Sequence, residues 1–397
     1  MQSKKSFLRI VVKVGSSLIS PKGSLIDLKY VSNIIEQINT LINKGVEVVL
    51  VSSGAIACGM SVLKLKKRPQ DIAGLQACAS IGQNELMGIY SGLLKKHNRL
   101  CAQLLLTWDD FEDRKRYLNV RHTVMNLLKI NVLPVINEND TVATDEIRFG
   151  DNDKLSALVA AATAADLLVI LSDVEGLYRL PQKQVIAVVK EITPEIKRLC
   201  HDSGKPQGSG LPSDRQSHKA AGSGLPSDRQ SHKAAGSGLP SDRQSHKQAC
   251  VGGMSSKLEA VKIAASSGIP SVIASGASMD SLIKSAAGVA VGTFFPAHGV
   301  TLKARQRWIA YGARVRGALI VDNGAKNALT KNGKSLLSVG ITRLKGNFNK
   351  NETVSIADEA ENEFARGKVN FSSTQLQSSI GMRLKQEVIH RDNMVLL

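Results

Sequence analysis

The sequence is poor in cysteine and in metal-binding patterns. Its five cysteines are scattered and odd in number, and no two have CxxC spacing (Cys58, Cys78, Cys101, Cys200 and Cys250). We therefore expect reduced thiols in a cytoplasmic protein rather than a disulfide framework. The eight histidines show no HExxH or other ligand spacing, so the sequence gives no indication of a zinc site.

Long apolar runs are also lacking. No stretch of about 18 or more apolar residues occurs, which argues against a membrane span. Residues 1–12 are basic and partly apolar, but Lys13 and Gly15 follow at once, so we expect a first strand rather than a signal peptide. Aromatic residues make up only 4% of a chain that is 43% hydrophobic and 22% charged. These values indicate a globular protein of two or three domains with a core of mainly Ala, Val, Ile and Leu.

Acidic residues are outnumbered by basic ones, and the formal net charge is +18. Residues 300–397 contain 16 Lys and Arg against 8 Asp and Glu. A basic C-terminal module is typical of a domain that contacts RNA or another polyanion. The alternative is a basic surface without a specific partner, and the charge alone does not separate the two.

Strand-like and helix-like segments alternate in the first part of the chain. Near-continuous apolar strands separated by helices are typical of a parallel sheet covered on both faces. We therefore predict an α/β fold, a three-layer αβα sandwich with a mainly parallel sheet. The expected strands are 7–14, 46–51, 101–106, 132–136, 167–171 and 270–274, and the expected helices are 27–43, 72–97, 115–130, 153–165 and 255–267.

Two further segments differ in composition from this α/β part. From about residue 315, short segments broken by Gly, Asn and Lys turns predict a small β-barrel-like domain over 315–397. Residues 296–314 are the predicted linker. Within the α/β domain of 1–295, a 14-residue unit, GSGLPSDRQSHKAA, occurs three times in 208–249, with Gln248 as a change in the last copy. Its composition predicts a flexible insertion, which we place at 205–249.

Ligands of such sheets bind at the carboxyl ends of the strands, so the residues there carry the functional prediction. Lys13 and Gly15 follow the first strand with two serines, an arrangement that suits a phosphate. Small residues around Ser53 after the second strand allow a substrate to approach the backbone. Either stretch alone is also compatible with an ordinary strand-to-helix turn.

Acidic residues are concentrated between positions 138 and 153. Such a group is costly unless a metal, a substrate ammonium or nearby lysines offset the charge. The alternative is a solvated acidic loop. The six residues are Glu138, Asp140, Asp145, Glu146, Asp151 and Asp153.

The stretch 251–257, VGGMSSK, is a further phosphate-binding candidate. It places Gly-Gly and two hydroxyls at the start of a predicted helix, with Lys257 one turn further on. The spacing is neither GxxxxGK[ST] nor GxGxxG, so neither a P-loop nor a dinucleotide fingerprint is present.

Together these stretches resemble the amino acid kinase family, and within it the members that phosphorylate the side-chain carboxylate of glutamate. The resemblance covers nearly the whole chain except 205–249, and its C-terminal part is similar to a PUA domain. The matching stretches are VVKVGSSL, VSSGAIACG, LLTWDDFEDRKRYLNVRHT, PVINENDTVAT, FGDNDKLSALVA, LLVILSDVEGLY, GGMSSKLEAVKIA, GTFFPAH and KARQRWIAYG.

This resemblance implies ATP-dependent conversion of L-glutamate to gamma-glutamyl phosphate, the first step of proline biosynthesis, with Mg²⁺ accompanying ATP. It implies that Lys13 and Lys257 contact the transferring phosphoryl group and that Asp153 orients them. Ser53, Asp140 and Asn152 would hold glutamate, and Asp151 would organise the Mg²⁺–ATP complex. The residues expected to bind ATP are Lys13, Gly15, Ser172, Asp173, Val251, Gly252, Gly253, Met254, Ser255, Ser256 and Lys257.

The resemblance also carries expectations about partners. It implies feedback inhibition by proline, a homo-oligomer, and handover of the acyl phosphate to glutamate-5-semialdehyde dehydrogenase. The repeat in 208–249 lies directly before the 251–257 stretch, and we hypothesise that it forms a mobile flap over ATP. Two rival functions stay open: another kinase of the family, acting on acetylglutamate, aspartate, carbamate or a nucleoside monophosphate, and an RNA-binding regulator on a kinase scaffold.

Overall fold

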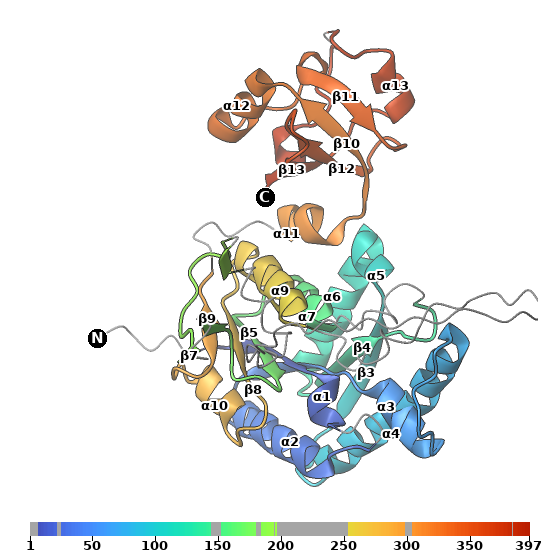
Figure 1. Ribbon diagram of the computed structural model, residues 1–397, viewed down its shortest axis with the longest axis vertical. Coiled ribbons are helices and arrows are strands. Elements are labelled where there is room, and N and C mark those ends of the chain that lie inside the picture. The colour runs from blue at the N-terminus through green and yellow to red at the C-terminus, as the bar shows by residue number, and fades with distance from the viewer. Residues whose placement is uncertain are drawn as a thin grey trace, which may run out of the picture.

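The computed structural model describes residues 7–21, 25–143, 152–179, 184–193, 195–196, 253–297, 304–382 and 384–397. An α/β domain forms the larger part of the molecule, and a smaller strand-rich domain made by the C-terminal residues lies beside it (Figure 1). Among the described residues, no helix is both long and apolar enough to cross a membrane.

The α/β domain is built on a sheet in which the described residues contribute strands in the order β3-β4-β2-β1-β5-β8-β9. All neighbouring strands pair in parallel except β9, which runs antiparallel to β8. β1 lies at the centre, where Ile10 is level with Val48 on one side and Leu167 on the other. The strands are β1 (Arg9–Val14), β2 (Glu47–Val51), β3 (Cys101–Leu106), β4 (Leu133–Glu138), β5 (Leu167–Ser172), β8 (Ser271–Ser275) and β9 (Thr293–Phe295).

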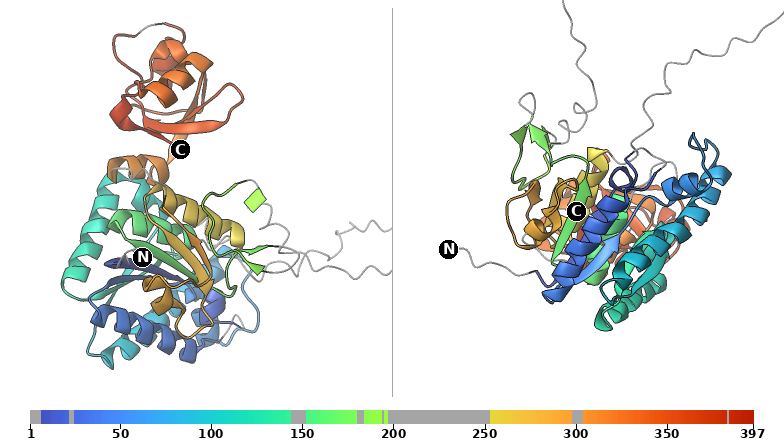
Figure 2. Two further views of the ribbon diagram at one scale, coloured as in Figure 1. Left: turned by 90° about the vertical axis from the view of Figure 1, so that its left-hand side faces the viewer. Right: turned by 90° about the horizontal axis from the view of Figure 1, so that it is seen from below.

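Helices cover both faces of this sheet and enclose a separate apolar core on each (Figure 2). Successive side chains of a strand point to opposite faces, so Val11 packs in one core while Ile10 and Val12 pack in the other. The first core contains side chains of α6 (Arg114–Lys129), α7 (Asn152–Thr163) and α9 (Met254–Ser266). The second contains side chains of α2 (Leu28–Asn43), α4 (Ile72–Lys95) and α10 (Ser281–Ala286).

The fold class that the sequence predicted is confirmed, and the expected elements are recovered with small shifts of their ends. Apolar periodicity explains this success, because most of these strands and helices have a buried apolar face, although β3 at the edge of the sheet is only partly buried. The short elements were not predicted separately. They include α1 (Ser16–Ile19), α3 (Ala55–Val62), α5 (Trp108–Glu112), β6 (Tyr178–Arg179) and β7 (Gln184–Val185).

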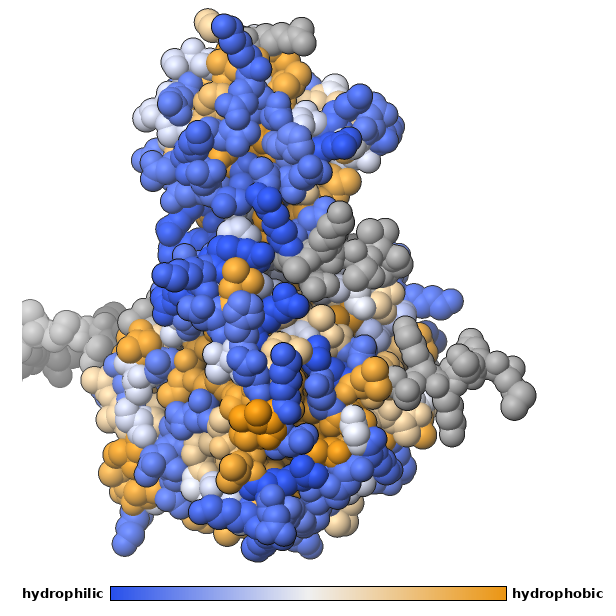
Figure 3. All heavy atoms as spheres, turned by 180° about the vertical axis from the view of Figure 1, so that it is seen from behind, coloured by the Kyte–Doolittle hydropathy of each residue, from blue (hydrophilic) through white to orange (hydrophobic). Residues whose placement is uncertain are grey.

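The C-terminal domain has its own sheet and its own core. Its strands lie in the order β11-β10-β12-β13-β14, with β10 and β12 parallel and the other pairs antiparallel. The face of this domain that Figure 3 shows is predominantly hydrophilic, while apolar side chains of the domain form an internal cluster. The elements are β10 (Val315–Val321), α12 (Asn323–Asn332), β11 (Ile341–Lys345), β12 (Thr353–Ala357), β13 (Glu363–Lys368), α13 (Ser373–Gln377) and β14 (Met394–Leu396).

The two domains are joined by a helical segment that is packed rather than extended. α11 (Ala304–Arg307) continues into a π-helical turn, Trp308–Gly312. Trp308 is buried and its indole N–H donates to the backbone oxygen of Phe111 at 2.7 Å. From the C-terminal domain, Arg366 donates to the backbone oxygen of Ala310 at 2.7 Å. The second half of the 296–314 stretch, which the sequence presented as a linker, is therefore part of the core of the α/β domain.

α3 and α4 contact each other through glycine. A Cβ placed on Gly59 would lie 1.9 Å from the backbone oxygen of Cys78, and one on Gly82 would lie 1.8 Å from that of Ala55. Real atoms cannot approach so closely, so any larger residue forces the helices apart. The two glycines thus set the distance between α4 and the start of α3.

We predict that Gly82→Ala lowers the free energy of unfolding by about 3 kcal/mol, a typical cost of overpacking a core. The matched control is Gly88→Ala in the same helix, where an added Cβ would meet no atom within 4 Å. This control should raise stability by about 0.5–1 kcal/mol, because alanine favours the helix over glycine. Denaturant titration of both variants measures the two values, and equal effects would contradict the close contact.

Candidate active site

Three charged side chains from three elements meet at the carboxyl edge of the central sheet. Lys13 lies near the end of β1, Asp153 in the first turn of α7 and Lys257 in the first turn of α9. The ammonium of Lys13 is 2.6 Å from Asp153 Oδ1, and that of Lys257 is 3.4 Å from Asp153 Oδ2. The hydroxyl of Ser256 donates to the same Oδ2 at 2.9 Å. One carboxylate therefore holds two lysines side by side.

These three groups are buried, with exposed fractions of 5% for Lys13, 1% for Asp153 and 6% for Lys257. Burial raises the pKa of Asp153, but attraction to Lys13 and then to Lys257 outweighs it, so the pKa lies below its ordinary value. The aspartate is therefore a carboxylate at neutral pH. Two ammonium groups beside the N-terminus of α9 form a cationic environment that suits a phosphate group.

The glycines and serines predicted to bind phosphate lie around this group. A Cβ on Gly15 would be 3.6 Å from the Lys13 ammonium, which places the β1–α1 turn directly against that lysine. Gly253 is the N-cap of α9, so the backbone N–H groups of Met254 and Ser255 open this helix. Such terminal N–H groups lack partners within their helix and can bind an anion.

A second group of side chains, all uncharged, adjoins the first. The side-chain nitrogen of Asn152 donates to the backbone oxygen of Ser52 at 2.7 Å, to the hydroxyl of Ser53 at 2.9 Å and to Asn137 Oδ1 at 2.8 Å. These bonds join the ends of β2 and β4 to the start of α7. Asn152 is the neighbour of Asp153, so the charged and the amide groups are continuous along α7.

The remaining predicted residues are distributed as follows. Ser172 ends β5, next to β1, and its hydroxyl donates to the carboxylate of Asp173 at 2.9 Å. Asp140 lies half-buried in the turn after β4 and interacts with Arg68. Burial lowers the pKa of Arg68, and the carboxylate of Asp140 opposes that shift. Asp151, Val251 and Gly252 lie outside the described residues, as does the 208–249 repeat.

The structure also shows residues whose part in the site the sequence did not reveal. Gln83 of α4 accepts a hydrogen bond from the side-chain nitrogen of Asn137 at 2.8 Å. In the sequence, Asn137 occurs only within the matching stretch PVINENDTVAT. The signal for Gln83 was a polar residue on the face of α4 that carries Cys78, Ala79 and Leu86, all buried.

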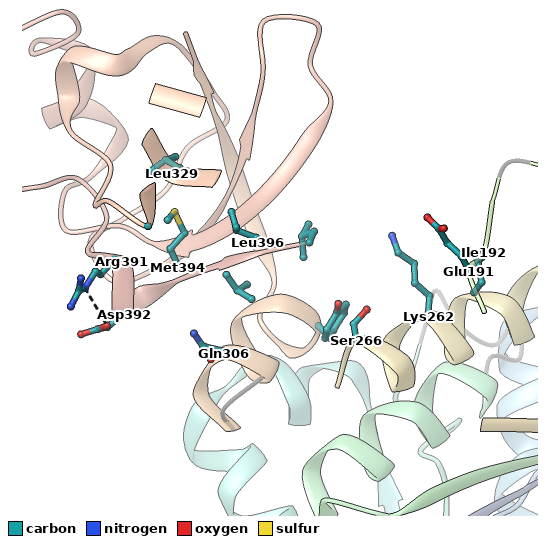
Figure 4. A pocket seen from close by; sticks show the side chains of 14 residues that line it. Glu191, Ile192, Lys262, Ser266, Gln306, Leu329, Arg391, Asp392, Met394 and Leu396 are labelled. Carbon is teal, nitrogen blue, oxygen red and sulfur yellow. Dashed lines mark ion pairs between the residues drawn. The ribbon is translucent and has the colours of Figure 1, made fainter. Parts of the chain in front are cut away.

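A groove of about 880 Å³ lies elsewhere, between the outer surface of α9 and the C-terminal residues of the chain (Figure 4). Lys262, Ser266 and Met394 line it, and none of the predicted site residues does. Among the described residues no cluster of three or more His, Cys, Asp or Glu is placed to hold a metal ion.

The mainly parallel sheet presents two buried lysines and a helix N-terminus at its carboxyl edge. This arrangement is typical of the class of enzymes that bind phosphate groups. The model of the amino acid kinase family matches residues 8–220, and that of the PUA domain matches residues 317–390. The chain belongs to the amino acid kinase family and carries a PUA domain at its C-terminal end.

Curated relatives match over nearly the full length. The glutamate 5-kinase of Nitrosospira multiformis is 44% identical, over 99% of this chain and 99% of its own. The glutamate 5-kinase of Caldanaerobacter subterraneus subsp. tengcongensis is 39% identical, and that of Burkholderia thailandensis is 40% identical, each over 98% of both chains.

We predict that Asp153→Asn lowers the free energy of unfolding by about 3–5 kcal/mol, because two buried lysines lose their carboxylate. The depressed pKa means that Asp153 contributes stability above its ordinary pKa of 3.8, and that this contribution is lost as pH falls through the lower folded value. The stability of the variant should therefore fall less steeply below pH 3.8 than that of the native protein.

Urea titrations at several pH values measure both effects. The control is Asp280→Asn, which removes an exposed carboxylate that pairs with Lys284 and also has a lowered pKa. Because solvent screens that pair, its loss should leave stability unchanged within error. A similar response of both variants would show that the Asp153 contact adds nothing.

Proposed function

We propose that this protein transfers the terminal phosphoryl group of ATP to the side-chain carboxylate of L-glutamate and forms gamma-glutamyl phosphate. The observation that carries the proposal is the pair of lysines held by Asp153 at the carboxyl edge of the sheet. The near full-length similarity to proteins named glutamate 5-kinase supports glutamate over the other substrates of the family.

The chemistry does not need a general base. A glutamate side chain has a pKa of about 4.3 in water, so its carboxylate is already a nucleophile at neutral pH. The difficulty lies in bringing two anions together, and the enzyme meets it by positioning and by positive charge. Lys13 and Lys257 neutralise charge on the phosphoryl group as it moves, and Asp153 keeps both ammonium groups in place before substrate arrives.

The uncharged side chains around Asn152 hold glutamate, the acceptor of the phosphoryl group. Ser53 and Asn152 lie beside the lysines on the side of β2 and β4, and there they bind glutamate. The carboxylate of Asp140 pairs with the ammonium of the substrate. On the other side of β1, Ser172 and Asp173 at the end of β5 bind the nucleotide, together with the first turn of α9.

Magnesium fits this arrangement through ATP rather than through a cage of protein ligands. Mg²⁺ keeps several waters and usually reaches a protein through one or two carboxylates and the substrate phosphates. When bound, it neutralises phosphate charge. Asp151 is the carboxylate that we assign to organising the Mg²⁺–ATP complex.

Several finer features of the proposal rest on the family resemblance and on charge alone. They are inhibition by proline at the glutamate site, assembly into a homo-oligomer, a cytoplasmic location, and handover of the acyl phosphate to glutamate-5-semialdehyde dehydrogenase. RNA binding by the C-terminal domain rests on the excess of Lys and Arg in residues 300–397, and binding that weakens steeply with salt would support it.

We expect Lys13→Met and Lys257→Met each to lower kcat at least about a hundredfold, the usual loss when one group that stabilises the transition state is removed. The assay is glutamate-dependent ADP formation, with hydroxylamine trapping of the acyl phosphate. Lys262→Met is the matched control, because Lys262 is exposed on the same helix as Lys257. Near-native turnover of a Lys13 or Lys257 variant that remains folded would contradict the assignment.

We expect Asp140→Asn to raise the KM for glutamate about tenfold, since a hydrogen bond between charged groups contributes about 1.5–3 kcal/mol. The KM for ATP should stay within twofold, because the nucleotide lies on the other side of β1. Initial rates at varied concentrations of each substrate separate the two constants. An unchanged KM for glutamate would remove Asp140 from the acceptor pocket.

A further inference from the structure

Gln83 is a polar residue on the buried face of α4, which is otherwise formed mainly by apolar side chains and glycine. Its exposed fraction is 7%, and Cys78, Ala79 and Leu86 on the same helix are also buried. Burying an amide costs free energy unless its groups are hydrogen-bonded. In the structure, the oxygen Oε1 of Gln83 accepts the 2.8 Å bond from the side-chain nitrogen of Asn137.

That bond fixes which way the side chain of Asn137 points. Because the nitrogen of Asn137 is directed at Gln83, its oxygen faces the opposite way. There Oδ1 accepts from the side-chain nitrogen of Asn152 at 2.8 Å and from the backbone N–H of Glu138 at 2.9 Å. Turning the side-chain amide of Asn137 by half a revolution would bring its nitrogen against the nitrogen of Asn152. Gln83, Asn137, Asn152 and Ser53 thus form a row of hydrogen-bonded side chains in which each amide sets the orientation of the next.

The row ends on an oxygen. With its nitrogen committed to Ser52, Ser53 and Asn137, the side chain of Asn152 has only Oδ1 left, and this buried atom accepts no hydrogen bond within the described part of the chain. A buried acceptor without a donor is costly. An incoming ammonium group would supply the missing donor.

We propose that Gln83 is a positioning residue for the acceptor substrate. It acts through Asn137 to hold Asn152 with its oxygen toward the ammonium of glutamate. This inference rests on the proposed function, since it takes Asn152 as a glutamate-binding residue.

Helix packing fixes the position of Gln83, as a positioning residue requires. Its neighbour Gly82 touches the backbone of α3 at Ala55 and Gly59, so α4 cannot shift or roll there without a collision. Ala55 follows Ser53 by two residues. The same contact therefore fixes both Gln83 at one end of the row and Ser53 at the other.

The experiment compares two substitutions at Gln83. Gln83→Met keeps the length of the side chain and removes the acceptor, whereas Gln83→Glu keeps an acceptor oxygen for Asn137 in either protonation state. We expect Gln83→Met to raise the KM for glutamate about tenfold, while the KM for ATP stays within twofold and kcat within about threefold. Gln83→Glu should recover most of the affinity for glutamate.

The matched control is Gln37→Met. Gln37 is an equally buried glutamine, 3% exposed, whose oxygen accepts from the backbone N–H of Leu282 in the contact between α2 and α10. Its loss should lower stability without a selective change in the KM for glutamate. If both variants change the same constants, or if Gln83→Glu behaves like Gln83→Met, Gln83 acts only through general stability and the proposal is overturned.

A double substitution tests the route. In an Asn137→Ala background the row is already broken, so adding Gln83→Met should change the KM for glutamate by less than twofold. A full additional tenfold effect would mean that Gln83 acts by another path. These outcomes are distinct from a failure of the proposed function, in which the native protein itself would form no ADP in response to glutamate.

Discussion

The contact on which the site depends is the shared carboxylate of Asp153. Two ammonium groups placed close together in a buried site would repel each other, and each would lose its hydration. A single aspartate between Lys13 and Lys257 offsets both costs and fixes the positions of both charges. The three residues lie on β1, α7 and α9, so this contact also ties the central strand to two helices of one face. The same three residues therefore form the charged part of the site and help to hold the domain together.

The other half of the site is held together by hydrogen bonds between uncharged groups rather than by ion pairs. Gln83, Asn137, Asn152 and Ser53 are uncharged, and their order comes from hydrogen bonds whose donors and acceptors must alternate. Such a row responds weakly to salt but strongly to small displacements, because hydrogen bonds weaken steeply when their angles deteriorate. The glycine contacts between α3 and α4 limit those displacements. In the proposed function, the cations bind the highly charged nucleotide and the amides bind glutamate, which needs both donors and acceptors.

The sequence predicted much of this arrangement because its signals were local. Apolar periodicity located the strands of the central sheet, and a parallel sheet necessarily brings the residues after its strands to one edge. Lys13 could therefore be placed at this edge, whereas its grouping with Asp153 and Lys257 came from the resemblance to the amino acid kinase family. The role of Gln83 could not be predicted, because its place on the buried face of α4 indicates burial but not the bond to Asn137. Trp308 was missed for a similar reason: a segment with many basic residues and a glycine has the composition of a linker, and only the contact with Phe111 places it in the core.

The charge state of the site follows from the same contacts. The carboxylate of Asp153 is kept ionised by two lysines, and the amide row carries no group that titrates near neutral pH. The acceptor carboxylate of glutamate is likewise ionised without help from the protein. No proton has to be taken up or released before phosphoryl transfer begins, so the protein needs no poised histidine or cysteine at this edge of the sheet. What it must supply is a fixed distance between two anions, and rigid contacts such as those of Gly59 and Gly82 serve that requirement better than a mobile acid or base would.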